Sequence, residues 1–215
     1  MLEVDHVWST IPVTAVARML RPEITAPVTE ACDAISYRGM VLIYIELDQA
    51  PFTEFDAHYF PGDDVTVTRM SEPKNYAVRE QPAGRTVLCA ELPCQVGDPV
   101  WSMDHDDLAA LLGRDLEASG LPLPHAPVAV TIRRLPQAYP VYLTGYEGPL
   151  EQVQDAVDGL PRFVTYGRQG LFAHDNTHHA LHMAYCAVEC LEDGRFNAER
   201  WAEHRVAFQS HVVED

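Results

Sequence analysis

Apolar and polar residues follow two different periods along this chain of 215 residues, which predicts both helices and strands. Residues 163–166 form a short β-branched and aromatic run that is typical of a strand. Further along, apolar residues recur at helical spacing, at Ala180, Met183, Ala184, Ala187, Val188 and Leu191. Gly167 and Gly170 separate the two patterns, and Asn176 or Thr177 can cap the helix. We therefore expect a strand, a glycine turn and a helix in this order.

The same patterns predict a second set of elements earlier in the chain. Residues 4–11 read as a strand that Pro12 closes before a helix over 13–20. Four further strands are expected over residues 38–48, 65–70, 86–92 and 128–135. Leucines at helical spacing behind the capping Asp104 predict a helix over 104–117. Strands separated mostly by turns, with one helix over them, predict an antiparallel or mixed sheet.

One of these strands shows the alternation expected of a half-buried strand. In residues 65–70, Val65 and Val67 would lie on one face and the intervening threonines on the other.

The glycine turn also has a chemical implication. A helix that begins after such a bend presents unpaired backbone N–H groups and a partial positive charge, which suit an anionic or electron-rich ligand. The start of the helix after Asn176 is therefore a candidate cofactor site.

The details of this turn resemble a known family. The pattern G-R-x-G-L-F, then N-x-x-H, then a helix with M-x-x-x-A, is similar to the last conserved segment of flavin-dependent oxidoreductases of the amine oxidase and protoporphyrinogen oxidase superfamily. UDP-galactopyranose mutases are similar at the same place. The resemblance implies that the turn and the helix start close over the flavin of FAD. The matched, cofactor-binding candidates are Gly167, Arg168, Gly170, Asn176, Thr177, His178 and His179. Relatives tend to carry glycine at Ala184 and an acidic residue near His178.

A second motif concerns the extent of the resemblance. Residues 5–12, D-H-V-W-S-T-I-P, look like an element that lies well inside complete members of the superfamily and leads from the substrate domain to the FAD domain. The resemblance therefore implies that the chain corresponds to the C-terminal half of such an enzyme. The expected class is α/β (α+β). A partial FAD-binding Rossmann-like layer would comprise residues 1–30 and 141–215, and a mixed or antiparallel-sheet substrate domain residues 31–140.

The dinucleotide-binding motif of such enzymes is absent from the sequence. None of the 12 glycines stands in a G-x-G-x-x-G arrangement. The chain is then one subunit of a split enzyme whose separate N-terminal FAD-binding half makes a hetero-oligomer, a truncated product, or a decayed remnant. Alone, it would expose apolar strand edges, so we expect self-association or a partner interface larger than the standard size.

Candidate substrate contacts follow two of the predicted strands. Residues 69–75, R-M-S-E-P-K-N, place Arg69 and Lys74 on a loop, where they suit a carboxylate or phosphate group. In the alternative interpretation this is a solvated turn in which Arg69 pairs with Glu72. Tyr139 leads back toward the glycine turn and is a candidate wall of the substrate pocket, although tyrosines at a domain crossover also serve as packing residues. Arg69, Lys74 and Tyr139 are the catalytic candidates.

Histidines and cysteines on the predicted helix raise the question of a metal. His178, His182 and Cys186 stand four residues apart, so on one helix they could coordinate zinc. Against this, His179 occupies the position where an H-E-x-x-H site carries its glutamate. We therefore expect no metal, and interpret the histidines as neutral groups lining a flavin pocket. The chain has five cysteines and no metal-ribbon spacing, which favours buried thiols.

Composition limits the function classes. A hydrophobic fraction of 47% with 22% charged residues is ordinary for a globular protein, and the net charge of −17 argues against nucleic acid or an anionic membrane as partner. With no signal peptide or spanning apolar run, a cytoplasmic location is the default expectation.

Three functions remain open. The first is an FAD-dependent oxidoreductase acting on a small-molecule substrate, active only with its partner chain. The second is a flavin-dependent isomerase of the sugar-nucleotide mutase kind, and the third is a non-catalytic interaction subunit.

Overall fold

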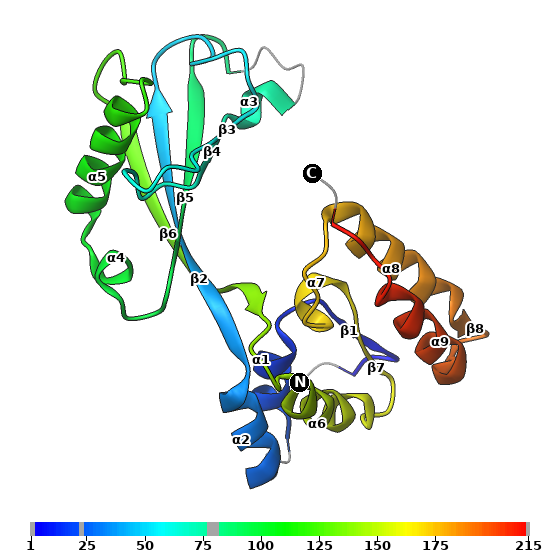
Figure 1. Cartoon of the computed structure of the whole chain (residues 1–215). Coiled ribbons are helices and arrows are strands. Elements are labelled where there is room, and N and C mark those ends of the chain that lie inside the picture. Colours follow the sequence, from blue (N-terminus) through cyan, green and yellow to red (C-terminus); the bar gives the residue numbers. More distant parts are fainter. Residues whose placement is uncertain (1–2, 22–23, 77–81, 214–215) are drawn as a thin grey trace. The chain divides into compact units, whose positions relative to one another are not determined.

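The computed structural model describes residues 3–21, 24–76 and 82–213. The chain separates into two compact units, one formed by residues 1–37 and 139–215 and the other by residues 38–138 (Figure 1).

A pair of parallel strands lies at the centre of the first unit. β1 (Val7–Ser9) pairs with β7 (Phe163–Thr165), with Trp8 opposite Val164. The expected strand over residues 4–11 is therefore too long, because only its middle pairs. Val4 and Ile11, which gave the sequence its apolar pattern, are exposed. The strand expected over 163–166 is confirmed for its first three residues.

Helices cover both faces of this strand pair. α1 (Val13–Met19), which confirms the helix expected over 13–20, shares one hydrophobic cluster with α2 (Ala26–Ala34) and α6 (Glu147–Asp158). Phe163 packs against that cluster, whereas its neighbour Val164 belongs to a second cluster with α8 (Thr177–Glu189) and α9 (Ala198–Phe208). Successive side chains of a strand point to opposite faces, so the two clusters lie on opposite sides of β7.

The helix after the glycine turn begins at Thr177. Its N-cap is Asn176, one of the two caps that the sequence predicted. Its buried face differs from the prediction. Met183, Cys186, Ala187 and Cys190 are buried, whereas Val188 is 59% exposed and Leu191 is also exposed. Thiols pack as small apolar groups, and here they occupy the inward stripe that the aliphatic pattern assigned to Val188 and Leu191.

A short hairpin of β8 (Leu191–Glu192) and β9 (Arg195–Phe196) connects α8 to α9.

The second unit is built on a five-stranded sheet in the order β3-β4-β5-β2-β6. Its strands are β2 (Ser36–Leu47), β3 (Ala57–Tyr59), β4 (Arg69–Ser71), β5 (Thr86–Cys94) and β6 (Ala129–Val141). The pairs β2–β5, β3–β4 and β4–β5 are antiparallel, with Ile43 opposite Ala90 at the centre. The expected sheet is therefore confirmed, and with the parallel pair of the first unit it confirms the α/β class.

One long helix packs its leucines on this sheet. α5 (His105–Ala118) buries Leu108, Leu111, Leu112 and Leu116 in one cluster with residues of β2 and β5. Asp104 caps it by accepting a hydrogen bond from the N–H of Asp107 at 2.9 Å, as predicted. The short helices α3 (Pro73–Tyr76) and α4 (Pro99–Ser102) complete the unit.

The strand expected over 65–70 begins only at Arg69. The buried carboxylate of Asp115, on α5, accepts hydrogen bonds from the N–H groups of Thr66 and Val67 at 2.7 and 2.9 Å. Because these donors bind a helix side chain, they do not continue the strand ladder. The predicted alternation nevertheless holds in the burial, since Val67 is buried between exposed threonines.

A stabilising substitution at Gly113 tests the register of α5. It lies inside α5, and a Cβ added there would meet no atom within 4 Å. Because glycine costs a helix interior about 0.5–1 kcal/mol relative to alanine, Gly113→Ala is expected to raise the free energy of unfolding by that amount. The matched control is Gly97→Ala, which is equally open but has a φ of +91° and should destabilise. Urea unfolding checks both, and a destabilised Gly113→Ala would contradict the helix register.

Candidate functional site

The turn between β7 and α8 depends on two glycines for different reasons. Gly167 opens α7 (Gly167–Gly170) with a φ of +77°, a conformation that side chains with a Cβ rarely adopt. At Gly170 an added Cβ would lie 3.2 Å from the backbone oxygen of Ser9. The first glycine therefore sets the direction of the turn, and the second lets it lie against β1.

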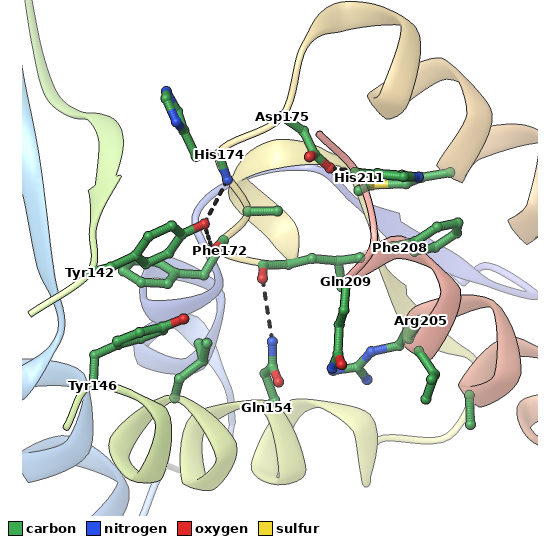
Figure 2. Close-up of a pocket in the computed structure, with 16 residues that line it drawn as sticks. Tyr142, Tyr146, Gln154, Phe172, His174, Asp175, Arg205, Phe208, Gln209 and His211 are labelled. Atoms are coloured by element: carbon green, nitrogen blue, oxygen red, sulfur yellow. Dashed lines mark hydrogen bonds and ion pairs between the residues drawn. The ribbon is translucent and has the colours of Figure 1, made fainter. Parts of the chain in front are cut away.

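Phe172 anchors the middle of the turn. This non-glycine residue has a φ of 53°, and its side chain is buried against the rings of Tyr37, Tyr142 and Tyr146, with ring centroids 5.1–5.9 Å away. The Tyr142 hydroxyl donates to the Phe172 carbonyl at 3.2 Å and accepts from the His174 N–H at 2.7 Å (Figure 2). Burial raises the pKa of Tyr142, so this hydroxyl keeps its proton at neutral pH. One tyrosine thus fixes both ends of the strained segment.

A cavity of about 800 Å³ opens beside this turn, between α6 and α9. Figure 2 shows the stacked rings of Tyr142 and Tyr146 on one side, with centroids 4.8 Å apart. Gln154, Arg205 and His211 bring polar groups to the other side. The Arg205 guanidinium is paired with Asp158, so part of its charge is already compensated. A flat ring against the tyrosines with a polar substituent toward α9 suits this lining.

Two of the predicted residues come together next to the turn. The guanidinium of Arg168 lies 4.2 Å from the ring centroid of Tyr139, a cation–π contact. The Nε atom of Arg168 is buried and has no hydrogen-bond acceptor among the described residues. Tyr139 also contacts the His174 ring at 5.7 Å. A buried donor without an acceptor is costly, which makes Arg168 a group that an external acceptor would satisfy.

The start of α8 is organised by a capping box. The N–H of Asn176 donates to Nδ1 of His179 at 3.2 Å, and the Asn176 side chain caps the N–H of His179. Thr177 and His178, between them, are exposed. Their N–H groups belong to the first turn and point out of the helix start. Burial lowers the pKa of His179, and the neighbouring imidazole of His178 lowers it further. The lowered pKa keeps Nδ1 available as an acceptor.

The zinc triad considered from sequence does not form. Among the described residues, the group with metal-ligand spacing is Asp175, His179 and His211. Cys186 Sγ lies 3.4 Å from His182 Nε2, whereas the His178 ring packs on His179 instead, at 4.0 Å. The thiol pKa values of Cys186 and Cys190 are raised by burial, as expected of inert buried thiols.

Arg69 has partners other than Glu72, the partner that the alternative interpretation gave it. Its guanidinium pairs with Glu91, donates to the Tyr76 hydroxyl at 2.7 Å and lies 5.6 Å from the Tyr59 ring centroid. The Arg69–Glu72 pair of the alternative interpretation is therefore wrong, because Glu91 lies directly opposite Arg69 in the β4–β5 register.

The segment after β4 has a structural role, because two of its side chains bind the backbone of other segments. The buried Glu72 carboxylate accepts from the N–H groups of Phe52 and Thr53 at 2.7 and 3.1 Å, and from the Thr86 hydroxyl. Lys74 Nζ donates to the backbone oxygens of Pro82 and Arg85, both at 2.8 Å. Glu72 and Lys74 thus tie three segments of the second unit together.

Comparisons with known proteins match the fold to part of larger proteins. A reduced UDP-galactopyranose mutase superposes with a TM-score of 0.61 at 23% identity, over 79% of this chain and 36% of that one. A protein of Exiguobacterium sp. 255-15 described as a protoporphyrinogen oxidase gives 0.55 at 22% identity, over 77% and 36%. A redesigned putrescine oxidase gives 0.51 at 12% identity, over 75% and 36%. The resemblance expected from sequence is confirmed as a likeness of fold.

These matches are structural, and they are partial. No protein-family model matches the chain, and no curated protein matches it in sequence. The chain spans about a third of the length of the solved structures with which it shares its fold. None of the helices in the described ranges is long and apolar enough to cross a membrane.

Proposed function

We propose that this chain covers the flavin and forms the substrate pocket of an FAD-dependent oxidoreductase of the amine oxidase type. The observation that carries the proposal is the turn from Gly167 to the capped start of α8, with Arg168 beside it. The Nε atom of Arg168 is buried and lacks an acceptor among the described residues. A cation and the N-terminal end of a helix, brought together by a glycine turn, suit a group that becomes negatively charged.

The residues present fit such a group. Arg168 would supply a charged donor, and the N–H groups of Thr177 and His178 would supply two more at the start of α8. When bound, FAD supplies the electron acceptor for a reduced-carbon substrate. His179 contributes indirectly, because its Nδ1 fixes the Asn176 N–H and so the position of the helix start. Gly167 and Gly170 allow the turn to take this course.

We further assign substrate contacts to three side chains. Tyr139, under the Arg168 guanidinium, would form an aromatic wall that excludes water. Arg69 keeps 28% of its side chain exposed and would present its outer edge to an anionic substrate group. Lys74 would act through its charge, because both of its described hydrogen bonds go to backbone carbonyls. In this proposal residues 31–140 form the substrate domain, and residues 1–30 and 141–215 the FAD-side layer.

A second polypeptide that carries the dinucleotide-binding half is part of the proposal. The parallel sheet of the first unit has two strands within the described residues, yet helices cover both of its faces. Parallel sheets with covered faces usually contain more strands, so the edges of β1 and β7 suit additional ones. Purified alone, the chain is expected to self-associate through these edges. Sedimentation as a monomer at all concentrations would contradict this expectation.

Loss of the Arg168 charge is expected to weaken flavin binding. A hydrogen bond to a charged group contributes about 1.5–3 kcal/mol, so Arg168→Ala should weaken FAD about tenfold or more. Arg195→Ala, an exposed arginine on the β8–β9 hairpin, is the matched control and should bind as the unaltered protein does. Flavin fluorescence titration of the protein, co-expressed with its dinucleotide-binding half, measures both. Equal affinities for the two variants would remove Arg168 from the site.

A second function is a flavin-dependent sugar-nucleotide mutase. The observation in its favour is the superposition on a reduced UDP-galactopyranose mutase with a TM-score of 0.61. Such an isomerase would need pre-reduced flavin and would bind a nucleotide sugar, whereas an oxidoreductase would consume an electron acceptor. Turnover assays with and without dithionite, in the presence of UDP-galactose, distinguish the two.

A further inference from the structure

Three side chains from separate segments converge at the edge of the cavity. Asp175 ends the turn before α8, His179 lies in the first turn of α8, and His211 follows the end of α9. One ligand-type atom of each lies within 4.8 Å of the others. Their side chains are 6%, 12% and 13% exposed, so the group is largely shielded from solvent. His211 is 36 residues from Asp175 in sequence, so only the fold brings it to the other two.

The charge balance of the group calls for a cation. In the described part of the chain, the groups within ion-pair distance of the Asp175 carboxylate are two imidazole nitrogens, Nδ1 of His211 at 3.1 Å and Nδ1 of His179 at 3.6 Å. Because Nδ1 of His179 accepts the Asn176 N–H, it carries no proton to share with the carboxylate. A buried carboxylate is costly unless a positive charge compensates it. Either a proton on one imidazole or a metal ion between the three groups supplies that charge.

The distances fit a metal. Zinc binds imidazole nitrogen and carboxylate oxygen at about 2.0–2.2 Å in a tetrahedron, which places neighbouring ligand atoms about 3.3–3.5 Å apart. Here Nδ1 of His211 lies 3.1 Å from one oxygen of Asp175 and Nδ1 of His179 lies 3.6 Å from the other oxygen, so each nitrogen is close to that spacing from the carboxylate. Imidazole with carboxylate is also a donor set that suits zinc and its neighbours in the first transition row.

We propose that Asp175, His179 and His211 form a binding site for a divalent transition-metal ion, with zinc as the ion that fits best. Three protein ligands leave the fourth tetrahedral position open. Asp175 and His211 line the cavity of about 800 Å³ beside the turn, so the open position would face that cavity. A water molecule or an anionic ligand would complete the coordination. This site revises the sequence-based expectation that the chain binds no metal, and it does not depend on the flavin proposal.

Two local changes accompany metal binding. The rings of His179 and His211 are stacked, with centroids 4.3 Å apart and 12° between their planes. One ring must turn about its Cβ–Cγ bond so that both lone pairs meet on one ion, and His211 is the ring that lies beyond the end of a helix. Nδ1 of His179 now accepts from the N–H of Asn176 at 3.2 Å. An ion bound at Nδ1 replaces that hydrogen bond.

Metal titration of the complete, tag-free protein tests the site. Zinc chloride is titrated against a chromophoric chelator, and cobalt chloride reports the geometry through its visible absorption bands. The proposal predicts one equivalent bound, intense cobalt bands typical of tetrahedral coordination, and faster amide exchange at Asn176 once metal is bound. His211→Ala and Asp175→Asn should each weaken zinc at least about tenfold. Asp175→Asn keeps the size of the side chain, whereas His211→Ala also removes ring contacts with His179 and Phe208.

His125→Ala is the matched control, because His125 is an exposed histidine of the second unit, and it should bind zinc as the unaltered protein does. Circular dichroism of His211→Ala and Asp175→Asn separates loss of the site from loss of the fold. Three outcomes overturn the proposal: no stoichiometric binding, weak octahedral-type cobalt bands, or zinc affinity that His211→Ala and Asp175→Asn leave unchanged. In each case a proton on the histidine pair would compensate Asp175.

Discussion

Replacing Glu72 with alanine is expected to lower the free energy of unfolding by about 3–4 kcal/mol. The carboxylate is 1% exposed and accepts hydrogen bonds from the N–H groups of Phe52 and Thr53, the Thr86 hydroxyl and the Asn75 side-chain amide. Alanine would leave these donors without their acceptor in a site that water does not reach. Urea unfolding followed by circular dichroism measures the loss.

Glu72→Gln separates charge from shape. It keeps the length of the side chain but replaces one acceptor oxygen with an amide that donates, in a site where three of the four neighbouring groups are N–H donors, so a smaller loss, about 2 kcal/mol, is expected. The matched control is Glu117→Ala on the exposed face of α5, which should change stability by no more than about 0.5 kcal/mol. If Glu72→Ala lowered stability as little as the control does, the structural role assigned to the Glu72 carboxylate would be wrong.

Phe172→Ala is expected to destabilise the first unit by about 3–5 kcal/mol. The ring is 2% exposed, and it contacts the rings of Tyr37, Tyr142 and Tyr146. Removing the ring leaves a cavity under the turn. The left-handed backbone conformation that Phe172 holds is also unfavourable for alanine, so the substitution relieves no strain. Because this turn leads into α8, flavin affinity should fall together with stability.

Phe55→Ala provides the comparison for that variant. Phe55 lies in the second unit with 55% of its surface exposed, so its loss should change stability by about 0.5 kcal/mol or less. Phe172→Leu refines the test, since it fills most of the volume and should recover part of the stability. Thermal unfolding of the three variants, with flavin titration of those that fold, gives the result. A Phe172→Ala protein as stable as Phe55→Ala would show that the ring does not hold the turn.

Sequence patterns predicted the elements whose apolar period is regular. The leucines of α5 predicted the helix, and the apolar, β-branched and aromatic run of β2 predicted the central strand of the sheet. α6 was missed although Leu150, Val153 and Val157 stand at helical spacing, so the signal was present. α2 had a weaker signal, because its buried residues are limited to Ala31 and Cys32.

The contacts of the candidate site depend on tertiary structure and could not be read from spacing. Glu91 takes the place of Glu72 beside Arg69 because strand register decides which carboxylate lies opposite the guanidinium. Asp175 and His211 meet because α9 folds back along α8. The glycines of the turn were predicted correctly as turn residues, since their backbone requirements are local. The left-handed conformation of Phe172 had no sequence signal, because it is imposed by its aromatic neighbours.

Hydrogen–deuterium exchange of the protein, co-expressed with its dinucleotide-binding half, with and without FAD tests the central claim most directly, because it locates the bound flavin on this chain. We predict slower exchange in peptides covering residues 167–180, where the glycine turn leads into α8, and recovery of fast exchange when FAD is removed. Unchanged exchange in that segment, with protection confined to residues 38–138 or absent from the whole chain, would contradict the assignment of the turn as the flavin site.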